Sequence, residues 1–157
     1  SELFKFSRDG RLLATLSFTD PARGSAVRLD FWDGRGGQII EAMEQLDILG
    51  IHFDALAFSR DGRRVFLTGT RSFYELDGAT TVSGRLVALA TPVVMNPIRL
   101  HQGRATVTWI GGLGPYAVDF ATTLGGRWLR LGVTDEHSWT ERQAGPKGFY
   151  RVRSLNP

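Results

Sequence analysis

The chain has 157 residues, of which 42% are hydrophobic and 22% charged, and its net charge at neutral pH is +3. These proportions are those of a folded globular protein and exclude a wholly disordered chain. The absence of cysteine excludes disulfides, thiolate zinc sites and cysteine nucleophiles. No apolar run approaches the roughly 20 residues of a membrane-spanning helix. The arginines of the chain are interleaved with acidic residues, so a nucleic-acid partner is not expected.

A six-residue sequence, Phe-Ser-Arg-Asp-Gly-Arg, occurs twice, at residues 6–11 and 58–63. In both copies one apolar run precedes it and another follows, which is the pattern of a β-hairpin. Asp-Gly favours a tight hairpin turn because both central positions adopt positive φ, which Gly takes up freely and Asp tolerates. We therefore expect two hairpins, with Asp9 and Asp61 at positive φ beside their glycines.

The spacing of the repeat indicates its architecture. The two hexapeptides lie 52 residues apart, whereas Trp32-Asp33-Gly34 and Leu76-Asp77-Gly78 lie 44 apart. The difference predicts an insertion in the turn-rich residues 19–25, and without it the repeat has the length of a four-stranded propeller blade. Residues 41–49, whose apolar spacing also fits a short helix, would connect the two copies. The predicted strands are residues 3–7, 12–17, 26–32 and 38–43 in the first copy and 55–59, 65–70, 72–76 and 85–90 in the second.

Residues 1–91 resemble two blades of the WD-repeat family of β-propellers. The resemblance lies in the repeated hairpin, in the 44-residue period and in Val27-Arg28-Leu29 leading into Trp32-Asp33. Related bacterial propeller repeats share the hairpin. Because a propeller closes with typically four to eight blades, the resemblance implies a fragment of a larger propeller. A protein partner, the remainder of the same polypeptide or an assembly of identical chains would then cover the open blades.

The pattern changes after residue 91. Thr91-Pro92 and Asn96-Pro97 bracket Val93-Val94-Met95, which predicts an extended linker or edge segment and a domain boundary near residues 92–97. Short alternating strands separated by Gly and Pro predict a small antiparallel β-sandwich over residues 98–157. Its strands are expected at residues 105–109, 116–120, 127–131, 137–141 and 149–153. The predicted fold class is therefore all-β, with two four-stranded propeller-type blades followed by a small antiparallel β-sandwich.

This second segment, residues 98–157, resembles a fibronectin type III module in a short bacterial form. The resemblance is carried by Val107-Thr108-Trp109, by a Gly-Pro pair before residues 116–120, by Trp128 and by the run at residues 149–156. Similar tails close many large secreted or surface proteins of environmental bacteria. The resemblance therefore implies an extracytoplasmic or cell-surface protein.

The sequence predicts no catalytic residue, metal ligand or cofactor site. His52, His101 and His137 lack further ligands at metal-binding spacing, and no serine lies in a nucleophile motif. Ser and Asp of the repeated hairpins are expected to be structural, because an active site is usually built once. The glycine-rich residues 34–37 and 111–114 are not followed by Lys-Ser/Thr, so they do not predict a phosphate-binding loop.

Aromatic residues are the remaining candidates for binding. Tyr116, Trp128 and Trp139 are the candidate ligand-binding residues, because aromatic faces stack on sugars and on cationic side chains. Trp109 alternates with Val107 and is expected in the core, while Trp32 is expected to pack within its blade.

The sequence is compatible with three functions. The first is a non-enzymatic binding or scaffolding segment of a larger bacterial propeller protein. The second is a carbohydrate-binding module of a secreted protein, with a glycan as the ligand. The third is part of a propeller hydrolase whose catalytic residues lie outside this chain.

Overall fold

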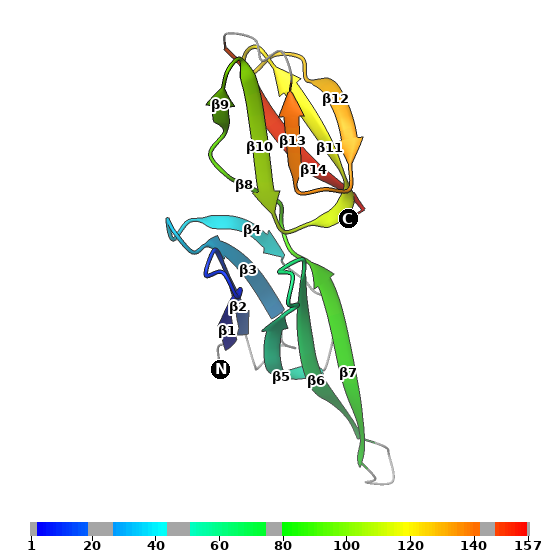
Figure 1. Cartoon of the computed structure of the whole chain (residues 1–157). Coiled ribbons are helices and arrows are strands. Elements are labelled where there is room, and N and C mark those ends of the chain that lie inside the picture. The colour runs from blue at the N-terminus through cyan, green and yellow to red at the C-terminus, as the bar shows by residue number, and fades with distance from the viewer. Residues whose placement is uncertain (1–2, 19–26, 44–50, 75–79, 142–146, 157) are drawn as a thin grey trace. The chain divides into compact units, whose positions relative to one another are not determined.

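The computed structural model of the chain describes residues 3–18, 27–43, 51–74, 80–141 and 147–156. The chain divides into two compact units, Ser1–Leu89 and Ala90–Pro157, which Figure 1 shows in blue to green and in green to red. Every regular element of the described residues is a β-strand, so the all-β prediction is confirmed. The predicted insertion at residues 19–25, the turn at residues 77–78 and most of the connection at residues 41–49 lie outside the described residues.

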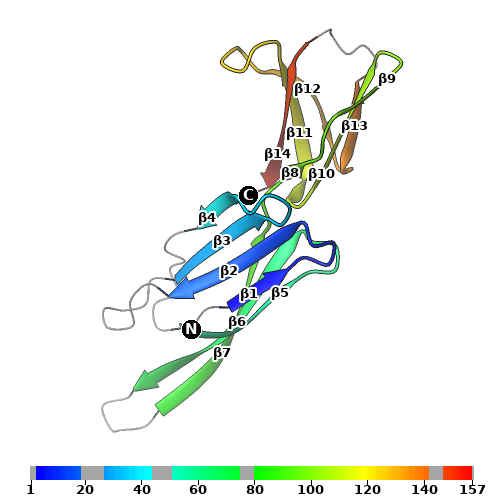
Figure 2. The same cartoon turned by 90° about the vertical axis from the view of Figure 1, so that its left-hand side faces the viewer.

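The first unit consists of two antiparallel sheets. One sheet has the order β1-β2-β3-β4 and the other has the order β5-β6-β7, so neighbours in the sequence are neighbours in each sheet (Figure 2). The strands are β1 (Leu3–Phe6), β2 (Leu12–Phe18), β3 (Val27–Asp33), β4 (Ile39–Met43), β5 (Ile51–Phe58), β6 (Arg64–Tyr74) and β7 (Thr80–Ala90).

The prediction of four strands in the second copy is wrong for the described residues. Residues 65–70 and 72–76 were expected as separate strands, but Arg64–Tyr74 forms the single strand β6. The only glycine of this segment is Gly69, and it pairs with Phe53 of β5 within the ladder. Because Thr70 and Arg71 supply no turn chemistry, the extended backbone continues through the expected break.

One hydrophobic core joins the two sheets of the first unit. Alternation turns every second side chain of a strand to the same face of its sheet. On the inner face of the first sheet, the paired positions Leu3, Leu16, Leu29 and Met43 form a row that crosses all four strands. These side chains pack with residues of β5, β6 and β7 in a core whose buried members are Ala14, Leu16, Val27, Leu29, Phe31, Phe53, Leu56, Val65 and Leu67.

The two repeated hairpins have the same turn, but it is not the turn that the sequence predicted. Gly10 and Gly62 have φ of 69° and 70°, whereas Gln102 is the one non-glycine residue with positive φ in the described part of the chain. The prediction for Asp9 and Asp61 is therefore wrong. Because the Gly10 amide donates to the Ser7 carbonyl at 2.9 Å, the glycine closes a four-residue turn, and this turn needs positive φ only at its last position.

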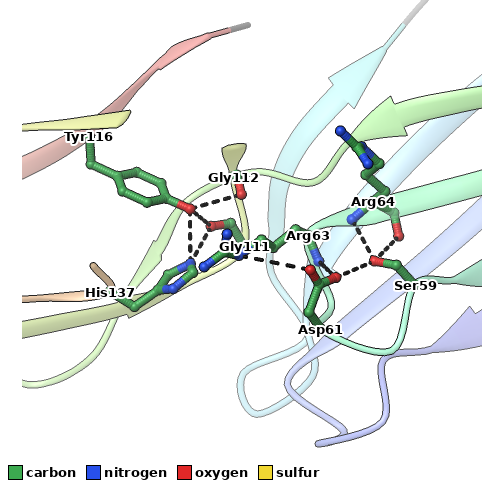
Figure 3. A network of polar contacts seen from close by, with 8 residues as sticks. All are labelled: Ser59, Asp61, Arg63, Arg64, Gly111, Gly112, Tyr116 and His137. Atoms are coloured by element: carbon green, nitrogen blue, oxygen red, sulfur yellow. Dashed lines mark hydrogen bonds and ion pairs between the residues drawn. The ribbon is translucent and has the colours of Figure 1, made fainter. Parts of the chain in front are cut away.

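Ser and Asp of the hexapeptide hold this turn together with their side chains. Ser7 Oγ donates to Asp9 Oδ1 at 2.7 Å and accepts the Leu12 amide at 2.9 Å. In the second copy, Ser59 Oγ donates to Asp61 Oδ1 at 2.6 Å and accepts the Arg64 amide at 2.9 Å (Figure 3). These side-chain bonds mimic backbone turn bonds, so the repeated sequence encodes a repeated turn.

The second unit also consists of two antiparallel sheets. In one sheet, β10 (Arg104–Ile110) pairs on one edge with β13 (Ser138–Glu141) and on the other with β8 (Val94–Met95) and β9 (Arg99–His101). The other sheet has the order β12 (Leu129–Thr134), β11 (Leu113–Ala121) and β14 (Phe149–Asn156). The proline-flanked residues 93–95 thus contribute an edge strand.

The sheets of the second unit share one core, in the manner of a small sandwich. Val107 and Trp109 of β10 are buried against Tyr116 and Val118 of β11 and Val152 of β14. Trp109 and Tyr116 make an edge-to-face contact with ring centroids 5.4 Å apart. Trp109 therefore lies in the core, as its alternation with Val107 predicted.

Candidate functional site

Tyr116, predicted as a ligand-binding residue, is fully buried. Its hydroxyl lies 2.9 Å from the Gly112 carbonyl, 3.2 Å from the Gly111 carbonyl and 2.9 Å from Nε2 of His137. Figure 3 shows the ring directed at this cluster. Alternation along β11 turns Tyr116 to the same side as Val118, which is the core side of the sheet, so its ring lies in the core and not at the surface.

Trp139, also predicted to bind a ligand, packs inside the second unit. Its ring lies against Gly132 of β12, so closely that a Cβ atom on this glycine would overlap Cη2 of the indole. The side chain contacts the core, and its indole nitrogen is buried. Trp139 is therefore partly buried against the facing sheet and is less open than a fully exposed ring on which a sugar would stack.

Trp128, the third predicted residue, is half-buried and lies under an arginine. The guanidinium carbon of Arg151 is 4.4 Å from the centroid of the Trp128 ring, in the geometry of a cation–π contact. The aromatic face of Trp128, which was predicted to bind a ligand, therefore contacts a cation of the same chain. Arg151 also belongs to a cluster of charged residues that was not predicted from the sequence.

Three arginines surround a single buried carboxylate on the outer face of the β12-β11-β14 sheet. Asp119 of β11 stands opposite Arg130 of β12 and Arg151 of β14 in the strand register. Arg151 Nη2 and Arg153 Nη2 each lie 2.8 Å from Asp119 Oδ2, and Arg130 Nε lies 3.7 Å from Oδ1. The Asp119 side chain is 3% exposed, whereas the arginines are 41–51% exposed. We call Asp119, Arg130, Arg151 and Arg153 the arginine cluster.

The electrostatics of the arginine cluster keep its carboxylate ionised. Burial acts to raise the pKa of Asp119, but hydrogen bonds from Arg151 and Arg153, together with their charges, outweigh it and lower the pKa below the ordinary 3.8. At neutral pH the cluster therefore contains three cations and one anion. The excess positive charge lies on side chains that reach solvent.

The first unit presents a different surface, on the outer face of its first sheet. Phe6, Leu13, Trp32 and Ile39 occupy successive paired positions and form an apolar row across all four strands. Phe4 stands two positions from Phe6 on the same face. Phe4 is 69% exposed, Phe6 50% and Ile39 46%. Trp32 is partly buried here and donates from Nε1 to Thr15 Oγ1 at 2.9 Å. We call these five apolar residues the outer row.

The two repeated hairpins border an open depression of about 520 Å³, lined by Arg8, Ser59, Arg60 and Asp61. The polar atoms of Ser59 and Asp61 are engaged in the turn. The pKa of Asp61 is lowered, first by the hydrogen bond from Ser59 and then by that from the Arg63 amide. These contacts stabilise the turn and do not activate a nucleophile.

The histidines do not form a metal centre in the described residues. His101 is exposed in β9, and His137 contacts Tyr116, while the side chain of His52 lies outside the described part. Across the described ranges, no group of three or more His, Cys, Asp or Glu side chains is placed to hold a metal ion. No helix of the described chain is long and apolar enough to cross a membrane.

Comparison with protein-family models finds no family that matches this chain, and a search of curated proteins finds no significant match.

Proposed function

We propose that this chain is a non-enzymatic binding or scaffolding segment of a larger propeller-type protein, and that the outer row is the surface through which it joins another β-sheet. The observation that carries the proposal is that the first sheet carries a row of apolar side chains on each of its two faces. Its inner row is covered by the second sheet of the same unit. Its outer row leaves large apolar side chains in solvent.

The proposal is supported by the free energy that is gained when such an apolar surface is covered. Fully burying a phenylalanine side chain is worth about 1.5–3 kcal/mol, and contiguous exposed apolar patches on folded proteins mark interaction sites. The outer row is continuous from strand β1 to strand β4, which matches the flat contact that one sheet makes with another. A stacked sheet, from the same polypeptide or from a second copy of it, fits this shape.

The two alternatives from the sequence have less support. A carbohydrate-binding module would use Tyr116, Trp128 and Trp139, but the first is in the core, the second lies under Arg151 and the third packs on Gly132. The propeller-hydrolase alternative places the catalytic residues outside this chain, and no observation on the described residues specifically favours it.

Sedimentation velocity of the purified chain over a concentration series tests the proposal. We expect self-association, because a second copy offers the same apolar surface. A Phe4→Ser/Phe6→Ser variant should weaken the association at least about tenfold, since each tenfold change in the dissociation constant corresponds to about 1.4 kcal/mol. Both residues are exposed in the chain, so this variant should retain the fold.

Leu124→Ser is the matched control, because Leu124 is 70% exposed but belongs to the second unit. It should leave the association unchanged. A chain that stays monomeric at every concentration would contradict the proposal. Equal weakening by the control and the double variant would show that the outer row is not the contact.

A further inference from the structure

The last strand of the second unit presents a regular stripe on its outer face. Alternate residues of β14, namely Phe149, Arg151, Arg153 and Leu155, lie on the same face of the strand. Phe149 is 42% exposed and Leu155 38%, and the arginines between them reach solvent to a similar extent. The intervening Tyr150 and Val152 belong to the core. The stripe therefore reads apolar, basic, basic, apolar.

The strand that carries this stripe is an edge strand. Within the described residues, β14 pairs with β11 and with no other strand. An edge strand offers unpaired backbone donors and acceptors to an incoming extended segment. Such a segment adds main-chain hydrogen bonds, while its alternate side chains determine specificity.

The charge on this face is unbalanced in a way that favours an acidic partner. Asp119 is the one acidic residue in β11, β12 and β14, which together carry Arg130, Arg151 and Arg153. Arg151 and Arg153 each approach Asp119 through Nε and Nη2. A guanidinium has five N–H donors in a fixed fork, so Nη1 of each remains to bind a further carboxylate. Asp119 holds the forks in place before any ligand arrives.

We propose that β14 is the docking strand for an extended acidic segment of a partner protein, in which two carboxylates at alternate positions meet Arg151 and Arg153 and flanking apolar residues meet Phe149 and Leu155. The spacing follows from the strand itself, because residues two apart are separated by about 7 Å on both the docking strand and the segment. The inference is independent of the proposed association through the outer row, which lies in the other unit.

The apolar ends of the stripe distinguish a peptide from a small anion. Phosphate or sulfate would satisfy the remaining guanidinium donors but would leave Phe149 and Leu155 uncovered. A peptide with the order apolar, acidic, acidic, apolar at alternate positions satisfies all four side chains. It also fits in either direction, because this order is symmetric.

The test uses the purified full chain and a capped synthetic peptide, Leu-Thr-Glu-Thr-Glu-Thr-Leu, titrated by calorimetry, with backbone NMR to locate the site. We expect binding that perturbs the amides of β14. Replacing both peptide glutamates by glutamine should weaken it about tenfold or more, because the charge-assisted contacts are lost. Raising the salt from about 50 to about 500 mM should also weaken it.

Arg153→Gln should reduce the affinity of the glutamate peptide at least about fivefold, whereas Arg99→Gln, an exposed arginine of the other sheet, should leave it unchanged. The glutamine peptide needs no protein variant, so it remains decisive even if Arg153→Gln affects folding. Absence of binding, equal binding of both peptides, or perturbations outside β14 and its neighbours would overturn the proposal. Displacement of the peptide by equimolar inorganic phosphate would instead show a general anion site, which also overturns it.

Discussion

Asp119 of β11 and Arg151 of β14 stand at directly paired positions, with Arg151 Nη2 2.8 Å from Asp119 Oδ2. Arg151 also lies over the Trp128 ring, so one guanidinium links a buried carboxylate to an aromatic face. Ala117 and Ala121, on either side of Asp119, are buried, which leaves room for the long side chains of the neighbouring strands. The outer face of this sheet is therefore arranged around a single carboxylate.

Replacing this carboxylate should change the pH dependence of stability in a defined direction. The folded pKa of Asp119 is below its ordinary value of 3.8, so its stabilising contribution is complete above that pH and is lost as the pH falls through the folded pKa. Asp119→Asn should lower the free energy of unfolding by about 1.5–3 kcal/mol at pH 7, the range for hydrogen bonds to charged groups. The difference between wild type and variant should shrink below pH 3.8. Urea unfolding at several pH values measures it, and a difference that is constant down to the lowest pH would contradict this account.

The two copies of the hairpin contain the same turn, but the serine of the turn is buried to a different degree in each. Ser7 is buried, whereas Ser59 is partly exposed, although both make the same pair of side-chain hydrogen bonds. Ser7→Ala should therefore lower the free energy of unfolding by about 1–3 kcal/mol, because the buried Leu12 amide is left unsatisfied, and Ser59→Ala by about 1 kcal/mol or less. Chemical denaturation of both variants tests this order, and the reverse order would be inconsistent with it.

Gly132 should tolerate no side chain, because the Trp139 ring occupies the space of its Cβ. We expect Gly132→Ala to lower the free energy of unfolding by about 1–3 kcal/mol through overpacking and to shift the tryptophan emission spectrum. Gly125→Ala is the control, since a Cβ there meets nothing within 4 Å, and its effect should stay within about 0.5 kcal/mol. Similar stabilities for the two variants would show that Trp139 is free to move aside.

The Tyr116 hydroxyl should contribute to the stability of the second unit, because it is buried among the Gly111 and Gly112 carbonyls and His137. Tyr116→Phe removes the oxygen without changing the ring, so we expect a loss of about 1–3 kcal/mol in the free energy of unfolding. Tyr150→Phe alters a ring that packs against the same core and should have a smaller effect. Thermal unfolding of the two variants compares them directly.

The local parts of the fold could be predicted from the sequence. Apolar alternation and Asp-Gly turns placed most strands close to where they occur, and the repeated hexapeptide does form a repeated turn. Two predictions of local structure were wrong, and each has a physical reason. The turn needs only one residue at positive φ, and Thr70-Arg71 has no turn residue to end β6.

The candidate surfaces were harder to predict, because they depend on which face of a sheet is covered. Tyr116 and Asp119 both lie on β11 but on opposite faces, and a single sequence does not say which face meets the other sheet. The arginine cluster also joins residues from three strands that are far apart in the sequence. The available signal was the alternation of Arg151 and Arg153 in the last strand, opposite the lone acidic residue of residues 113–121.

The outer row of the first sheet is proposed as an association surface, so its residues should become covered when two copies of the chain associate. Hydroxyl-radical footprinting of Phe4, Phe6 and Ile39 as a function of protein concentration tests it most directly, with Leu124 as the reference in the other unit. We expect oxidation of the three outer-row residues to fall as the concentration rises, while that of Leu124 stays constant. Oxidation of the outer row that is the same at every concentration would contradict it.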